Sequence, residues 1–141
     1  VRKIVADYWC EGELWKELSS FAEKNKIAIS GSTFSIYHDT EFKERNVDIE
    51  LCAPVNTNGN VEPPFNLRTT ESVLNMACTM VYGEFSNIRN GYLAFAEWLE
   101  KNSGYKMTAP TRQIVHRGPW NESDPEKYLT EIQIPLVSDT V

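Results

Sequence analysis

Two glutamates set among apolar residues are the side chains best suited to binding or proton-transfer chemistry. Glu131 lies in the strand-like run 128–136, and Glu50 lies in 47–55, which has the same order of glutamate, aliphatic, two residues, proline and aliphatic. Alternate side chains of a strand share a face, so Ile132 would point to the core while Glu131 points away from it. A carboxylate placed this way can hold a cation or transfer a proton.

Aromatic side chains are plentiful around these two segments. The 141 residues include 16 aromatic ones (4 Trp, 6 Tyr and 6 Phe), which is more than the apolar faces of two helices would need. Desolvating a carboxylate in such a pocket raises its pKa unless a cation or a hydrogen-bond donor stabilises the charge. An organic cation would do so, and cation–π attraction would add about 0.5–2 kcal/mol. The candidate ligand-binding residues are therefore Glu131, Glu50, Tyr37, Tyr82, Trp9, Trp120 and Tyr128.

A duplicated unit of strand, helix, strand and strand would position these residues. Apolar residues recur at helical spacing in 14–25 and 88–102, and both segments end on Glu-Lys-Asn. Expected strands are 3–8, 33–38 and 47–54 in one half, and a long or broken 69–82, 111–116 and 128–136 in the other, with a charged loop at 39–46.

This pattern predicts an α+β fold of duplicated βαββ units with pseudo-twofold symmetry. We expect an antiparallel sheet with two helices on one face, within a single domain 1–141 whose half-repeats are about 1–56 and 68–141. A groove between such halves is a natural place for a small-molecule pocket.

Other interpretations of the same side chains stay open. Both glutamates could lie on a solvated sheet face, as ordinary strand glutamates do. A glutamate of raised pKa could act as a general acid, although the sequence has no nucleophile elbow, HExxH motif or phosphate loop. His38 and His116 occupy equivalent places in the two halves and could bind haem or a metal ion, but each ends a strand beside a charged loop. We expect no cofactor and no metal.

Composition narrows the protein class. With 41% hydrophobic and 24% charged residues, the chain has the composition of an ordinary soluble domain, and no apolar run reaches the roughly 20 residues of a membrane span. Cys10, Cys52 and Cys78 are too widely spaced for a CxxC site, which suits a reducing, cytoplasmic setting. A net charge of -6 argues against this piece binding a phosphate backbone by itself.

The duplicated unit that closes on Thr-Glu-Ile-Gln-Ile-Pro-Leu resembles the GyrI-like small-molecule-binding domain. That domain also occurs as the C-terminal effector module of MerR-type and AraC-type bacterial transcription regulators. The resemblance covers nearly the whole chain, and its most specific stretches are 11–18, 36–39 and 130–135. It implies a central pocket whose glutamate maps onto Glu131 and meets lipophilic cations between aromatic rings, as in multidrug sensors.

The resemblance also implies partners. A ligand-sensing domain of this kind would contact DNA only through a separate DNA-binding domain, would have no membrane partner and would form a homodimer in the full-length regulator. No helix-turn-helix or coiled coil is recognisable here, so the DNA-binding domain would belong to another part of a longer chain. Some GyrI-like proteins resemble hydrolases that open strained rings, and a stand-alone hydrolase of cyclopropanoid genotoxins is the alternative function.

Overall fold

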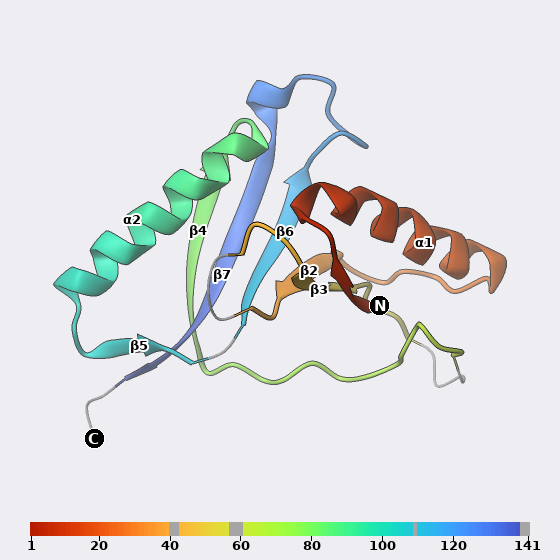
Figure 1. Cartoon of the computed structure of the whole chain (residues 1–141), viewed down its shortest axis with the longest axis horizontal. Coiled ribbons are helices and arrows are strands. Elements are labelled where there is room, and N and C mark those ends of the chain that lie inside the picture. The colour runs from red at the N-terminus through yellow and green to blue at the C-terminus, as the bar shows by residue number, and fades with distance from the viewer. Residues whose placement is uncertain (40–42, 57–60, 109, 139–141) are drawn as a thin grey trace. The chain divides into compact units, whose positions relative to one another are not determined.

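Each half of the chain folds as one long helix packed on antiparallel strands (Figure 1). The structure is a computed structural model that describes residues 1–39, 43–56, 61–108 and 110–138. The chain divides into two compact units, Val1–Glu71 and Ser72–Val141.

The first unit is built around β3 (Val47–Cys52), the middle strand of three. β1 (Arg2–Val5) pairs antiparallel with one edge of β3, and β2 (Phe34–Tyr37) pairs with the other. The connection between β1 and β2 carries η1 (Tyr8–Cys10) and α1 (Glu11–Lys24). Acidic residues in the first turn of α1 and a lysine in its last turn suit the helix dipole.

The alternation of β3 separates an apolar face from a charged one. Val47, Ile49 and Leu51 are at most 1% exposed and form a core cluster with Leu14 of α1. Burying such a side chain contributes about 1.5–3 kcal/mol, so these contacts fix which face of the strand meets the helix. Glu50 therefore points away from α1.

The second unit repeats this plan around β7 (Leu129–Ser138). β4 (Asn75–Tyr82) and β6 (Thr111–Arg117) pair antiparallel with β7 on its two sides, and β5 (Tyr105–Met107) pairs with its last residues. η2 (Phe85–Asn87) leads into α2 (Ile88–Lys101), which is drawn to the left of β4 in Figure 1. η3 (Pro125–Lys127) precedes β7.

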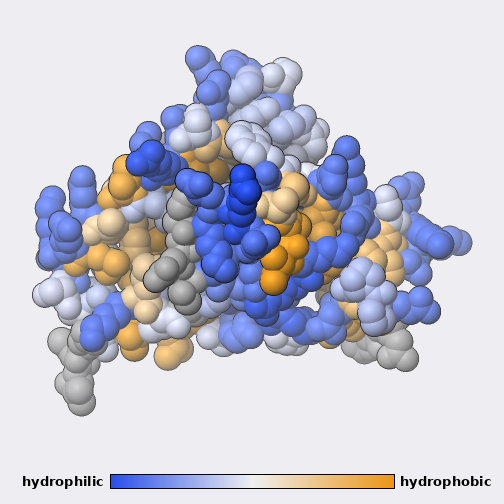
Figure 2. All heavy atoms as spheres, viewed as in Figure 1, coloured by the Kyte–Doolittle hydropathy of each residue, from blue (hydrophilic) through white to orange (hydrophobic). Residues whose placement is uncertain are grey.

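The core of the second unit lies between α2 and these strands. Ile132, Ile134 and Leu136 are buried there together with Val81 of β4. The helix lies close to the sheet at Gly91, where an added Cβ would be 2.8 Å from Val81 Cγ2 and 2.9 Å from Ile132 Cδ1. In Figure 2, hydrophobic residues are visible as orange patches among polar ones on the left of the view, where Figure 1 places α2.

The predicted fold class and both predicted helices are confirmed, while some boundaries were wrong. The strand predicted over 69–82 begins only at Asn75, and β5 was not predicted. Tyr8, predicted as the last residue of the first strand, belongs to η1 together with Trp9. Positions 40–42 of the predicted loop lie outside the described residues. Among the described helices, none has the length and apolar character to cross a bilayer.

Candidate functional site

Glu131 projects from the face of β7 that is turned away from α2. Its neighbours in sequence, Thr130 and Ile132, are buried toward the helix, so alternation places Glu131 on the other face. The residues paired with Glu131 on the two neighbouring strands are Met80 of β4 and Ile114 of β6. The Glu131 side chain is 19% exposed. The carboxylate therefore has apolar side chains on both sides and restricted access to water.

Two hydrogen bonds hold the Glu131 carboxylate in its ionised form. Gln133 Nε2 donates to Oε2 at 2.6 Å, and His116 Nε2 lies 3.0 Å from Oε1. The Gln133 bond, followed by the His116 contact, lowers the pKa of Glu131 despite the opposing effect of burial. His116 is its only ion-pair partner among the described residues. An ionised Glu131 is suited to binding a cation and poorly suited to the general-acid role of the hydrolase alternative.

The bulge in β6 explains how His116 reaches Glu131. The register shifts between Val115 and Arg117, so His116 is the extra residue of the strand. A β-bulge redirects the side chain at which it occurs. The contact therefore depends on a local irregularity of β6 as well as on the alternation of β7.

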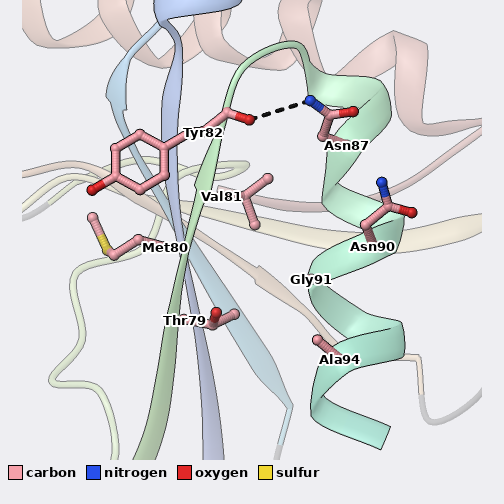
Figure 3. Close-up of a pocket in the computed structure, with 8 residues that line it drawn as sticks. All are labelled: Thr79, Met80, Val81, Tyr82, Asn87, Asn90, Gly91 and Ala94. Carbon is pink, nitrogen blue, oxygen red and sulfur yellow. Dashed lines mark hydrogen bonds between the residues drawn. The ribbon is translucent and has the colours of Figure 1, made fainter. Parts of the chain in front are cut away.

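Further side chains on this face come from β4. Figure 3 shows Met80 and Tyr82 pointing away from α2, whereas Val81 points toward it. Cys78 pairs across the strands with Gln133, and the pKa of its thiol is raised by burial and by the charge of Glu131. Tyr82 is thus the predicted site residue that shares a sheet face with Glu131.

Glu50 has a different environment although it holds the equivalent place on β3. Arg68 donates two hydrogen bonds to it, from Nη2 to Oε1 at 2.6 Å and from Nε to Oε2 at 2.7 Å. His38 Nε2 lies 2.8 Å from Oε1. The Arg68 hydrogen bonds, with His38 helping, lower the pKa of Glu50 to about 2 against the effect of burial. Its negative charge is already neutralised within the unit.

The two units therefore repeat a histidine–glutamate pair and differ in the third partner. His38 contacts Glu50, and His116 contacts Glu131. The third partner is a guanidinium at Glu50 and a neutral amide at Glu131. Of the two carboxylates, Glu131 is the one that has no lysine or arginine partner in the described part of the chain.

A model of the GyrI-like small molecule binding domain family matches residues 11–137. This chain belongs to the GyrI-like family. The predicted family is confirmed, and the match spans both units.

Two solved structures are similar to this GyrI-like chain over 97% of its length. One is the crystal structure of the EcmrR C-terminal domain, with a TM-score of 0.88, 29% identity and 88% of that chain covered. The other is a cryo-EM structure of an EcmrR–DNA complex, also at TM-score 0.88 and 29% identity. The present chain spans about half of that second chain, 53% of its length. No curated protein shows a significant match.

The remaining predicted residues of the first unit lie away from Glu50. Tyr37 is directed toward α1, where its hydroxyl donates to Glu11 Oε2 at 3.0 Å and its ring packs against the core cluster. Trp9, in η1, is 92% exposed. Neither residue shares the sheet face of Glu50, and ligand contact by either stays a prediction.

In the second unit, Trp120 and Tyr128 lie in the connection between β6 and β7. Tyr128 is buried, with its ring centroid 5.1 Å from that of Phe85. Trp120 is 64% exposed, and its ring covers Gly118. These contacts give both rings a packing role, and ligand contact by either also stays a prediction.

A separate groove of about 390 Å³ runs between α2 and β4 (Figure 3). Its lining residues are Thr79, Met80, Val81, Tyr82, Asn87, Asn90, Gly91 and Ala94. They include Tyr82 and not Glu131, so the groove is distinct from the surface around the carboxylate. In the described residues, no group of three His, Cys, Asp or Glu side chains could hold a metal ion.

Sequence reasoning missed four partners of the glutamates, namely Gln133, His116, His38 and Arg68. Gln133 could have been found, because it is two residues from Glu131 on the same face. The histidines could have been found from their equivalent places in the two halves. Arg68 gave no signal, because it lies in a segment without regular secondary structure.

Proposed function

We propose that this GyrI-like chain is the effector-binding domain of a bacterial transcription regulator and that it binds lipophilic cations at Glu131. The observation that supports this most directly is the carboxylate itself. Glu131 is ionised and 19% exposed, and its ion-pair partner among the described residues is one histidine. Met80 and Ile114 supply apolar surface on its two sides.

A lipophilic cation would gain from both features of this surface. Its charge would be attracted to the Glu131 carboxylate, and its apolar groups would cover the flanking side chains. The ring of Tyr82, which is 67% exposed on the same face, could add a cation–π contact. A neutral ligand of the same shape would gain only the apolar contacts, so the site would select for charge and for general lipophilicity.

The regulatory role rests on the similar structures. The larger similar chain is described in a complex with DNA, and the present chain covers 53% of it. A net charge of -6 argues against this chain binding a phosphate backbone by itself. We therefore propose that DNA is bound by a separate domain, within a homodimeric regulator. Ligand binding would bias that domain if the two states of the regulator differed in ligand affinity.

Calorimetric titration with a matched pair of ligands tests the site. Methyltriphenylphosphonium and triphenylphosphine oxide have similar shapes, but only the first is charged. At about 4 Å, two unit charges attract by ~1 kcal/mol in water and ~4 kcal/mol at an effective dielectric constant of 20. For a carboxylate of 19% exposure we expect roughly 2 kcal/mol, which is about 30-fold in Kd.

Glu131→Gln should therefore weaken binding of the phosphonium about 30-fold and leave binding of the oxide nearly unchanged. Glu97→Gln, which alters an exposed glutamate of α2, is the matched control for the loss of one negative charge. Equal affinity of the wild-type chain for both ligands, or equal losses in the two variants, would refute a cation site at Glu131.

A further inference from the structure

The segment that follows the strands of the first unit carries an arginine back to β3. Phe65 fixes this segment on α1, because its ring stacks on Phe21 with centroids 3.9 Å apart. Three residues later, Arg68 reaches Glu50 on the face of β3 that is turned away from α1. The segment has no helix or strand between these two points. The side chains of Phe65 and Arg68 therefore tie this segment to α1 and to β3.

The Arg68–Glu50 contact is a guanidinium–carboxylate pair joined by two hydrogen bonds. Both carboxylate oxygens accept a hydrogen bond from the guanidinium, and the Glu50 side chain is only 11% exposed. His38 contacts the same carboxylate from β2's C-terminal end, and Glu71 Oε1 lies 3.3 Å from Arg68 Nη1. The guanidinium is thus held by two carboxylates and touches the buried one through parallel hydrogen bonds.

We propose that Glu50 and His38 form a second cation site, selective for guanidinium, and that Arg68 occupies this site as a built-in ligand. That Glu50 is a cation-binding counterpart of Glu131 rests on the proposed function. Its preference for a guanidinium group rests only on the contacts that Glu50 makes in the structure. The fold thus provides a histidine–glutamate pair in each unit and closes one of them with its own side chain.

The selectivity follows from the shape of the two partners. A planar guanidinium presents two N–H groups in parallel to the two oxygens of a carboxylate, which an ammonium or a quaternary cation cannot do. A guanidinium compound that displaced Arg68 would also remove the side-chain contact through which Arg68 ties this segment to β3. The wild-type chain should consequently bind one lipophilic cation, at Glu131, and leave the Glu50 site filled by Arg68.

Chemical rescue tests this proposal in the whole chain. Arg68→Ala leaves Glu50 buried without its strongest partner, so the Tm of the variant should fall. Millimolar methylguanidinium should restore at least half of the lost Tm along a saturable curve, because a ligand that binds only the folded state stabilises it. Methylammonium at the same concentration should restore much less, and adding Glu50→Gln should abolish the rescue.

The matched control is Arg2→Ala. Arg2 makes a similar two-bonded contact to Asp48 on the adjacent strand, but its side chain is 54% exposed. Methylguanidinium should therefore raise the Tm of neither Arg2→Ala nor the wild type. An equal rise of Tm in all the variants, or no rise in Arg68→Ala, would overturn the proposal.

Two further variants separate the remaining outcomes. If Arg68→Ala does not fold, Arg68→Gln keeps the side-chain stem and should fold when methylguanidinium is added. A chain that stays unfolded at saturating methylguanidinium would also count against the site. Glu131→Gln should leave the rescue intact. Intact rescue without any phosphonium binding would refute the proposed function and leave the Glu50 site standing.

Discussion

Replacing Glu50 with glutamine should make the stability of the chain less sensitive to acid. The pKa of Glu50 is about 2 in the folded chain and 4.5 as the ordinary value. Its folded pKa is depressed, so this stabilisation is complete above the ordinary pKa and is lost as the pH falls through the folded pKa. This pKa difference of about 2.5 corresponds to a contribution of about 3 kcal/mol to the free energy of unfolding at pH 7. About 2 kcal/mol of that contribution is lost by pH 3.

Urea unfolding at a series of pH values from 7 to 3 measures this effect. Glu50→Gln leaves Arg68 and His38 without their carboxylate, so the variant should be less stable than the wild type at pH 7. The gap between the two free energies of unfolding should shrink by about 2 kcal/mol between pH 7 and pH 3, because the wild type loses its charged Glu50 over that range.

The exposed Glu23→Gln variant of α1 is the control for removing one titrating carboxyl group. The difference in free energy of unfolding between this variant and the wild type should stay nearly constant from pH 7 to pH 3. If wild type and Glu50→Gln instead lose stability in parallel from pH 7 to 3, the Arg68 contact does not hold Glu50 ionised, and the reasoning above fails.

Three other changes test the site and the core of the second unit. Gln133→Ala removes the strongest donor to Glu131, so the carboxyl pKa should rise toward 4.5, and an unchanged value in an NMR titration would contradict this assignment. Ile132→Ala should lower the free energy of urea unfolding by about 2–5 kcal/mol, because this side chain is fully buried, and a loss below about 1 kcal/mol would argue against the packing under α2. Gly91→Ala should lower the Tm, because its added Cβ would lie under 3.0 Å from side chains of β4 and β7. Gly12→Ala is the control and should raise the Tm slightly, because the space around Gly12 is open. Equal shifts of Tm in the two variants would count against the close approach of α2 to the sheet at Gly91.

Much of the fold could be predicted because burial imposes a period on the sequence. Ile132 and Ile134 alternate with polar residues along one strand, and the core cluster under α2 matches that alternation. The helices followed from apolar residues at helical spacing. β5 was missed because its three residues are all exposed and carry no such pattern.

The candidate site was predictable only in part. The sequence singled out Glu131 and Glu50, and strand alternation gave the face on which each lies. Tyr37 shows the limit of this reasoning, because a residue near the site in sequence can point to the opposite side of its strand. Its partner Glu11 is a residue of α1 and is distant in the sequence.

The sequence by itself determined the repeated unit, the two glutamates and the family, since all three depend on local order and spacing. Tertiary structure alone decided which glutamate has an arginine partner and which has none among the described residues. The charge state and partners of a carboxylate depend on the groups within a few ångströms of it, and chain folding selects those groups. Gln133 and a bulge at His116 leave Glu131 without an arginine or lysine partner in the described residues, whereas Arg68 neutralises Glu50 from 18 residues away.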